Sequence, residues 1–177
     1  GSANAGDYAA IAIGNGAEAT SIGSVAVGSN SRAVFAGGTA LGNGANAAGT
    51  VSVALGVDSL ARSDGSVAIG QKASANIFAT AIGMQSNASG RTSTALGALA
   101  IASSERAAAL GTFSTASGVN ALALGTSANA SVENSVALGG STTTKRKVLR
   151  SLPCCQGTQI RAPRAYRALR RSWHFRQ

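Results

Sequence analysis

The sequence has little of what an ordinary globular interior requires. Aromatic residues make up only 4% of the 177 residues, proline occurs twice, and alanine is by far the commonest member of the hydrophobic fraction of 45%. Large side chains dominate the energetics of most protein cores. A conventional globular core is therefore excluded, and the fold must be stabilised in another way.

Residues that hold metals or perform catalysis are also scarce. The only cysteines, Cys154 and Cys155, are adjacent, and His174 is the single histidine. Two cysteines cannot form a disulfide framework or, without other ligands, a four-ligand zinc site. The six acidic residues are scattered, whereas an enzyme built on a parallel β-helix would need clustered carboxylates. We therefore predict a protein that is not an enzyme and that has no cofactor and no metal site.

The charge is unevenly divided along the chain. Residues 1–144 contain five basic and six acidic side chains, whereas residues 145–177 contain ten Lys and Arg and no acid. The net charge of +9 therefore belongs to the tail and does not describe the rest of the chain. No run of about 18 apolar residues is present and no signal peptide opens the sequence, so we expect any export and anchoring segments to lie outside it.

One phrase recurs through the first 144 residues. Its Ala-aliphatic-Gly core repeats every fourteen residues, with a single step of thirteen. In the first nine repeats Ala or Ser follows three positions after the glycine, and alanine follows five positions after it, as at Ser59 and Ala61; Thr142 and Thr144 stand there in the tenth. We predict that the glycines are corners, where backbone freedom is needed. They are Gly14, Gly28, Gly42, Gly56, Gly70, Gly83, Gly97, Gly111, Gly125 and Gly139.

Each phrase contains two short segments with the alternation of a β-strand. Val53-Ala54-Leu55 alternates aliphatic and small residues, Ser59-Leu60-Ala61 alternates again, and Arg62-Ser63-Asp64-Gly65 has the composition of a turn. Two strands and two turns in fourteen residues are too short for a helical repeat. The period predicts an all-β fold, a β-solenoid of about ten coils in which equivalent strands stack in parallel about 4.8 Å apart.

The alternation also predicts which side chains are buried. We expect the aliphatic residue before each glycine to point inward, and we expect the invariant alanine before it to point outward, where another copy of the chain covers it. A fourteen-residue coil buries little apolar surface, too little to make a stable monomer expected, which also favours association. The predicted core and association residues are Ala12, Ile13, Ala26, Val27, Ala40, Leu41, Ala54, Leu55, Ala68, Ile69, Ala81, Ile82, Ala95, Leu96, Ala109, Leu110, Ala123, Leu124, Ala137 and Leu138.

The run NSVALG at residues 134–139, with SVAVG, SVALG and SVAIG earlier, resembles the head repeats of YadA-like trimeric autotransporter adhesins of Gram-negative bacteria. The resemblance implies a left-handed parallel β-roll and a homotrimer. It also implies a position at the bacterial surface, with a C-terminal barrel outside this sequence as the outer-membrane anchor, and attachment to host extracellular matrix or cells. The handedness and the number three come from the resemblance alone.

This resemblance divides the chain into three parts. Residues 1–7 are expected to be a lead-in that begins with an expression remnant, residues 8–144 the β-roll head, and residues 145–177 a basic tail that does not continue the family pattern. We expect the tail to be a solvated extension, although its arginines and aromatics are also compatible with nucleic acid or anionic lipid. The competing prediction for the whole protein is a structural spacer that has no ligand of its own.

Two local features have alternative interpretations. The thirteen-residue step at Asn76-Ile77-Phe78 is expected to shorten one corner; alternatively, Ile77 and Phe78 form part of a ligand surface. Phe35 lies in the corresponding turn of a coil that is too early in the chain to form a matching surface, so the sequence favours the ligand surface only weakly. A column containing Thr39, Thr80 and Thr94 is too often interrupted by aliphatic residues to indicate an ice-binding face. The sequence does not identify the ligand-binding residues.

Overall fold

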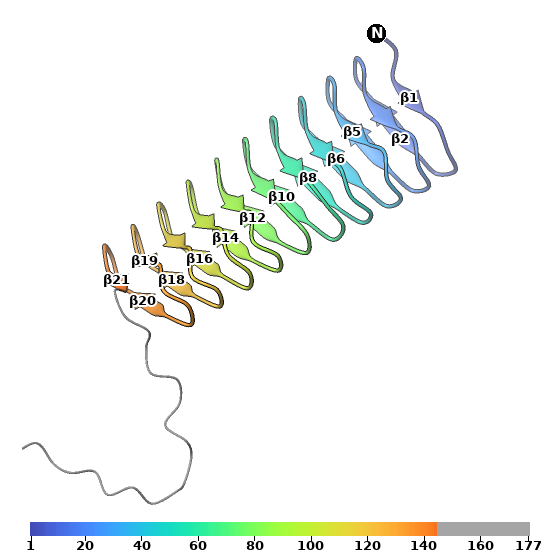
Figure 1. The fold of residues 1–177 in the computed structure, drawn as a ribbon. Helices are drawn as coiled ribbons and strands as arrows, with labels where there is room; N and C mark the ends of the chain where they lie inside the picture. Colours follow the sequence, from blue (N-terminus) through green and yellow to red (C-terminus); the bar gives the residue numbers. More distant parts are fainter. Residues whose placement is uncertain (145–177) are drawn as a thin grey trace, which may run out of the picture.

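The computed structural model describes residues 1–144, which form a rod of stacked coils (Figure 1). Each complete coil consists of a three-residue strand, a bend, a two-residue strand and a turn. The predictions made for the basic tail, including those for Cys154, Cys155 and His174, lie outside the described residues. The predicted parallel β-solenoid of about ten fourteen-residue coils is confirmed.

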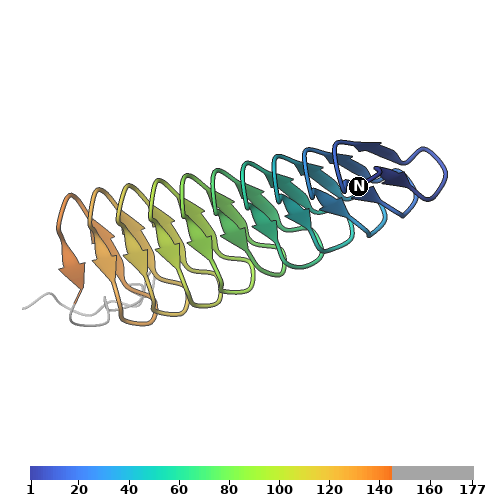
Figure 2. The ribbon, with the colours of Figure 1, turned by 90° about the horizontal axis from the view of Figure 1, so that it is seen from above.

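The strands form two parallel sheets that run the length of the rod (Figure 2). The ten-stranded sheet, which we call the long-strand sheet, consists of β2 (Ile11–Ile13), β4 (Val25–Val27), β6 (Thr39–Leu41), β8 (Val53–Leu55), β10 (Val67–Ile69), β12 (Thr80–Ile82), β14 (Thr94–Leu96), β16 (Ala108–Leu110), β18 (Leu122–Leu124) and β20 (Val136–Leu138). The eleven-stranded sheet, which we call the short-strand sheet, consists of β1 (Asn4–Ala5), β3 (Glu18–Ala19), β5 (Arg32–Ala33), β7 (Asn46–Ala47), β9 (Leu60–Ala61), β11 (Ser74–Ala75), β13 (Asn87–Ala88), β15 (Ile101–Ala102), β17 (Thr115–Ala116), β19 (Asn129–Ala130) and β21 (Thr143–Thr144).

The register places each residue beside its equivalent in the next coil. In the long-strand sheet Ala54 pairs with Ala68, and in the short-strand sheet Ala61 pairs with Ala75. Hydrogen bonds continue outside the strands, since the backbone N–H of Asp58 donates to the carbonyl oxygen of Asn43 at 2.9 Å. The sequence repeats because every coil supplies donors and acceptors to an identical neighbour.

The thirteen-residue step shortens one turn and leaves the sheets intact. β10 pairs with β12 through Val67 and Thr80, which are thirteen residues apart, and the strands remain in register. The backbone N–H of Phe78 donates to the carbonyl of Asp64 at 3.1 Å, as Gly65 donates to Thr50 at 3.0 Å in the preceding coil. The expectation of a shortened corner is confirmed.

The solenoid begins earlier than the predicted boundary at residue 8. Strand β1 pairs in parallel with β3, so that Asn4 lies beside Glu18 and Ala5 beside Ala19. Residues 4 and 5 therefore belong to the first coil and are not a lead-in. The Ala-aliphatic-Gly core is absent there because only the second half of a phrase is present, and Asn4-Ala5 matches the Asn-Ala pairs of later coils.

The interior is built almost entirely from alanine and serine. Among residues 1–144, every buried apolar side chain is an alanine and every buried polar side chain is a serine. From β4 to β20 the alanine of each long strand is part of this core, as shown by Ala26, Ala54 and Ala95, all with an exposed fraction of 0%; Ala12 of β2 is only partly buried. The small residues of the other half of the coil, such as Ser59 and Ala61, are buried in the same core.

The predicted directions of the long-strand side chains were wrong. Ala54 is fully buried inside its coil, whereas Leu55 points outward with 40% of its surface exposed. The same reversal holds for the other members of the two columns, because strand alternation places them on opposite faces. The two walls of so small a coil leave room only for methyl and hydroxymethyl groups. The alanine is therefore invariant because of the space inside its own chain.

The buried serines satisfy their hydroxyl groups locally. Ser52 donates to the carbonyl of Gly49 at 2.6 Å, and Ser59 donates to the carbonyl of Gly56 at 2.9 Å. In both cases the acceptor is three residues earlier, at the bend that the serine follows. A buried hydroxyl with a partner avoids the desolvation cost of an unpaired one. Serine can therefore replace alanine in the core and strengthen a corner as well.

The predicted corner glycines lie at the bend after each long strand, where successive backbones approach closely. Gly70 has a φ of +124°, a conformation that L residues rarely adopt. A Cβ atom built on Gly70 would lie 2.6 Å from the carbonyl oxygen of Gly83 in the next coil. Glycine is thus required by the backbone conformation and by the stacking of the bends.

Replacing Gly70 with alanine should lower the free energy of unfolding by about 3 kcal/mol or more, because backbone strain and overlap with the next coil add together. Gly23→Ala is the matched control: its φ is +63°, and no heavy atom lies within 4 Å of an added Cβ. The control should cost about 1 kcal/mol. Thermal unfolding followed by circular dichroism measures both. Equal losses would contradict the stacking argument.

Replacing Ala54 with leucine should cost about 3 kcal/mol, since the interior has no space for the added carbons. Asn46→Leu is the control, because Asn46 points outward on the short-strand sheet beside Leu60. It should change stability by no more than about 0.5 kcal/mol. Denaturant unfolding of the two variants tests the inward direction of the alanine column; a tolerated leucine at position 54 would refute it.

Candidate interaction surfaces

The outward side of the long-strand sheet is an aliphatic face that extends along the rod. On each strand, the residues before and after the buried alanine point away from the coil. Leu55, Leu96 and Leu124 are 40%, 46% and 40% exposed. We define the aliphatic face as Ile11, Ile13, Val25, Val27, Leu41, Val53, Leu55, Val67, Ile69, Ile82, Leu96, Leu110, Leu122, Leu124, Val136 and Leu138.

Threonine interrupts this face without forming a regular rank. Thr80 pairs with Thr94 in the sheet, but Val53 and Val67 stand between Thr39 and Thr80. An exposed apolar surface of this extent indicates a region of contact with another molecule. The side chains available for contact are therefore the aliphatic residues, not the alanines assigned to this role from the sequence.

The outward side of the short-strand sheet is more polar and varies from coil to coil. The outward column of this sheet contains Glu18, Arg32 and Asn46, with Leu60 and Ile101 among the other members. The Nε of Arg32 lies 2.9 Å from a carboxylate oxygen of Glu18, and both side chains are about half exposed, at 53% and 44%. An exposed ion pair of this kind contributes little to stability. The two sides of the rod thus differ in chemistry.

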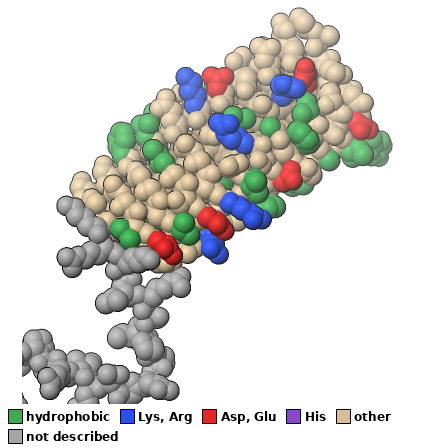
Figure 3. All heavy atoms as spheres, viewed as in Figure 1, with side chains coloured by type: hydrophobic (Ala, Val, Ile, Leu, Met, Phe, Trp, Pro, Cys, Tyr) green, Lys and Arg blue, Asp and Glu red, His purple; other side chains and the backbone are tan. Residues whose placement is uncertain are grey.

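Acidic and basic side chains are interspersed on the face shown in Figure 3 and do not form a strongly charged patch there. Within residues 1–144 there is no group of three or more His, Cys, Asp or Glu residues able to hold a metal ion. The part of the chain that the structure describes also contains no helix long and apolar enough to span a membrane.

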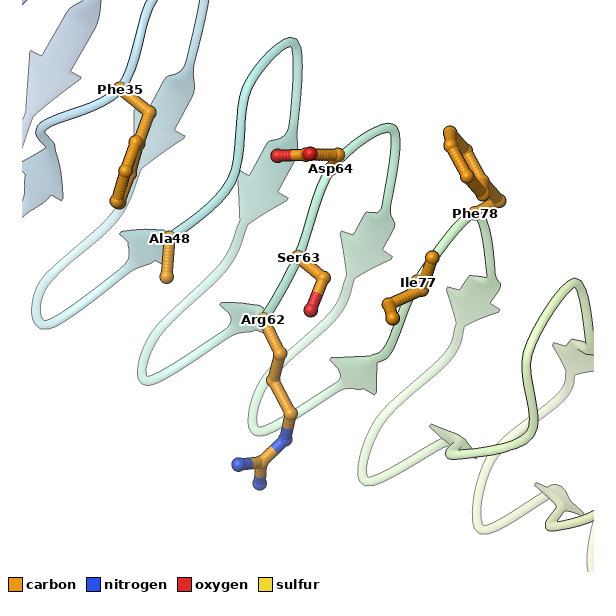
Figure 4. Close-up of a pocket in the computed structure, with 7 residues that line it drawn as sticks. All are labelled: Phe35, Ala48, Arg62, Ser63, Asp64, Ile77 and Phe78. Carbon is orange, nitrogen blue, oxygen red and sulfur yellow. The ribbon is translucent and has the colours of Figure 1, made fainter.

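A surface hollow of about 310 Å³ lies beside the shortened turn (Figure 4). It is lined by Phe35, Ala48, Arg62, Ser63, Asp64, Ile77 and Phe78. Phe35, Ile77 and Phe78 are 46%, 39% and 55% exposed. The sequence favoured a surface shared by Phe35, Ile77 and Phe78 only weakly, because Phe35 stands several coils earlier. The stacking of short coils brings these turns to the same edge of the rod.

A regular rod of stacked fourteen-residue coils places the chain in the class of β-solenoid repeat proteins. The family model described as "YadA head domain repeat (2 copies)" matches residues 8–31, 36–59, 52–73, 61–86, 75–100, 88–114 and 116–142. The chain belongs to this family of adhesin heads, which confirms the family resemblance and the prediction that the protein is not an enzyme. Adhesins of the YadA family are exposed at the bacterial surface.

Among solved structures, the chain is similar to the one titled as the collagen-binding domain of the Yersinia adhesin YadA. The identity is 26%, the alignment covers 88% of this chain and 69% of the other, and the TM-score is 0.40. No curated protein sequence matched the chain.

Sequence reasoning missed two functional features. Residues that precede the buried alanines, such as Val53 and Val67, belong to the aliphatic face, but they were considered only as interruptions of a threonine column. Their sequence signal was an aliphatic residue on both sides of an invariant alanine. The hollow was missed because it depends on which turns the coils bring together, and no local pattern shows this.

Proposed function

We propose that the protein is the head of a homotrimeric adhesin that is displayed outside a Gram-negative cell and attaches it to host extracellular matrix or cells. The observation that carries this proposal is the aliphatic face along a rod whose repeats belong to the YadA head family. The number of chains and a left-handed sense of coiling are inferred from the family resemblance.

Association follows from the chemistry of the aliphatic face. The interior accepts only small side chains, so the larger apolar groups of each coil lie at the surface, where they can be removed from water only by another chain. Each buried methylene group contributes about 0.8 kcal/mol. Because the face continues over ten strands, modest burial on each coil adds up along the rod. Packing of sister chains through this face leaves the short-strand sides free to contact other molecules.

A trimeric rod would display three copies of every site. Linked copies of a weak site bind a multivalent surface far more strongly than one copy does, provided that several sites can engage at once. Extracellular matrix and cell surfaces present many copies of their components. The rod therefore suits attachment through avidity, without a deep pocket for one small ligand.

The spacer function is favoured by one observation, the variation of the outward column on the short-strand sheet. A side chain that changes in every coil does not build a repeated binding site. A spacer would need the same rod and the same association, so only a binding measurement separates the two functions.

The double variant Leu55→Asp with Leu96→Asp should dissociate the trimer, because it would bury unpaired carboxylates between chains. Each coil should remain folded, since both side chains point away from the interior. Leu60→Asp is the control on the short-strand sheet and should leave the trimer intact. Sedimentation velocity gives the mass, and circular dichroism reports the β-structure. A wild-type chain that sediments as a monomer would refute the association.

Binding to immobilised collagen, fibronectin and laminin and to host cells tests the adhesin function. Saturable binding to at least one of these is expected. The dissociated Leu55→Asp, Leu96→Asp chain should bind at least about a hundredfold more weakly, since avidity is lost. Absence of binding by the intact trimer to the whole panel would favour the spacer.

A further inference from the structure

The hollow beside the shortened turn has two apolar walls separated by small residues. Phe35, Gly49, Ser63 and Ile77 are each the second residue after the short strand of their coil. The two large side chains are three coils apart, about 14 Å at the usual strand spacing, and the two coils between them offer only glycine and serine at this position. Figure 4 shows Phe35 and Ile77 on either side of Ala48 and Ser63.

Two neighbouring glycines help to shape the hollow. The ring of Phe78 lies against Gly65, where an added Cβ would be 2.8 Å from a ring carbon. The absence of a side chain at Gly65 therefore lets this ring settle on the preceding turn. At Gly49 an added Cβ would overlap the backbone of Ser63, so this position can carry no side chain to fill the gap. The opening is set by the packing of the turns.

The two charged side chains at the rim, Arg62 and Asp64, differ in their hydrogen bonds. The Nε of Arg62 donates to the Oγ of Ser74 at 3.0 Å, and Arg62 takes part in neither of the two ion pairs among residues 1–144. Asp64 accepts a hydrogen bond from the backbone N–H of Thr50 at 2.8 Å and points toward the preceding coil. The terminal nitrogens of the Arg62 guanidinium group are thus available to a carboxylate of a ligand. The carboxylate of Asp64 repels an acidic group of a ligand near its own position.

We propose that this hollow binds an extended polypeptide segment whose apolar side chain enters between Phe35 and Ile77 while a neighbouring carboxylate pairs with Arg62. The polypeptide nature of the ligand rests on the proposed adhesin function. A second copy of this chain is not the expected occupant, because the lining residues belong to turns after the short strands and lie outside the aliphatic face. Aromatic and arginine side chains, both of which line the hollow, are also enriched at protein interfaces.

The test uses the full chain with labelled isoleucine methyl groups and the peptide acetyl-Gly-Phe-Glu-Gly-amide as the probe. Titration followed by methyl NMR should shift the Ile77 signal and leave that of Ile22, in another turn, unchanged. Replacing the peptide's Glu with Gln, or making Arg62→Gln, should weaken binding by about tenfold through loss of the charged hydrogen bond. Ser63→Leu, which fills the floor of the hollow, should abolish the shift.

Arg91→Gln is the matched control, an exposed arginine in a turn that does not line the hollow, and should bind the peptide as the wild type does. An unmoved Ile77 signal at millimolar peptide would overturn the proposal, as would equal binding of the Glu and Gln peptides. An Ile77 signal that depends on protein concentration and not on peptide would show that a second copy occupies the hollow, which also overturns it.

Matrix binding by the same variants separates this proposal from the adhesin function. If Arg62→Gln and Ser63→Leu bind the matrix panel as well as the wild type does and the peptide does not titrate Ile77, the subsite is refuted while the adhesin function stands. If the peptide titrates Ile77 but the intact trimer binds no matrix component or cell, the subsite is supported and the matrix-adhesin function is refuted.

Discussion

The whole structure depends on the stacking of identical small residues in a narrow interior. Each coil has room only for alanine and serine between its two short walls, and each wall donates its backbone hydrogen bonds to the equivalent wall of the next coil. Large side chains cannot enter without forcing the walls apart. The fold therefore gains its stability from the regular repetition of backbone contacts, and any residue that breaks the repetition acts on two neighbouring coils.

This narrow interior decides where the larger apolar groups go. In most domains, leucine and valine fill the core, whereas here they flank each buried alanine on the outside of the long-strand sheet. The exposed aliphatic face is thus a direct consequence of a core too small to hold it. The association of chains that we propose, and with it the display of several copies of any site on one rod, rests on the same constraint.

A turn that departs from the repeat creates a local difference on a rod whose surface is otherwise regular. The loss of one residue from the turn at Asn76-Ile77-Phe78 leaves both sheets in register but changes the surface at that edge. Where a perfect repeat would present the same side chain along a column, the turns here place Phe35 and Ile77 around Ser63. Irregular turns can carry individual binding sites because the two sheets, and not the turns, hold the rod together.

The sequence by itself determined the solenoid, its period, the number of coils and the position of the corners, because these follow from local spacing and from the alternation of a strand. It also indicated the family, through a motif repeated ten times. The sequence could not decide which side of each long strand faces inward. An invariant alanine such as Ala54 is expected both where a sister chain covers it and where its own coil encloses it. Only the tertiary structure decided this, because the distance between the two sheets of a coil does not follow from the spacing of residues along one strand. The hollow likewise exists only after stacking, since it joins turns that lie more than forty residues apart between Phe35 and Phe78.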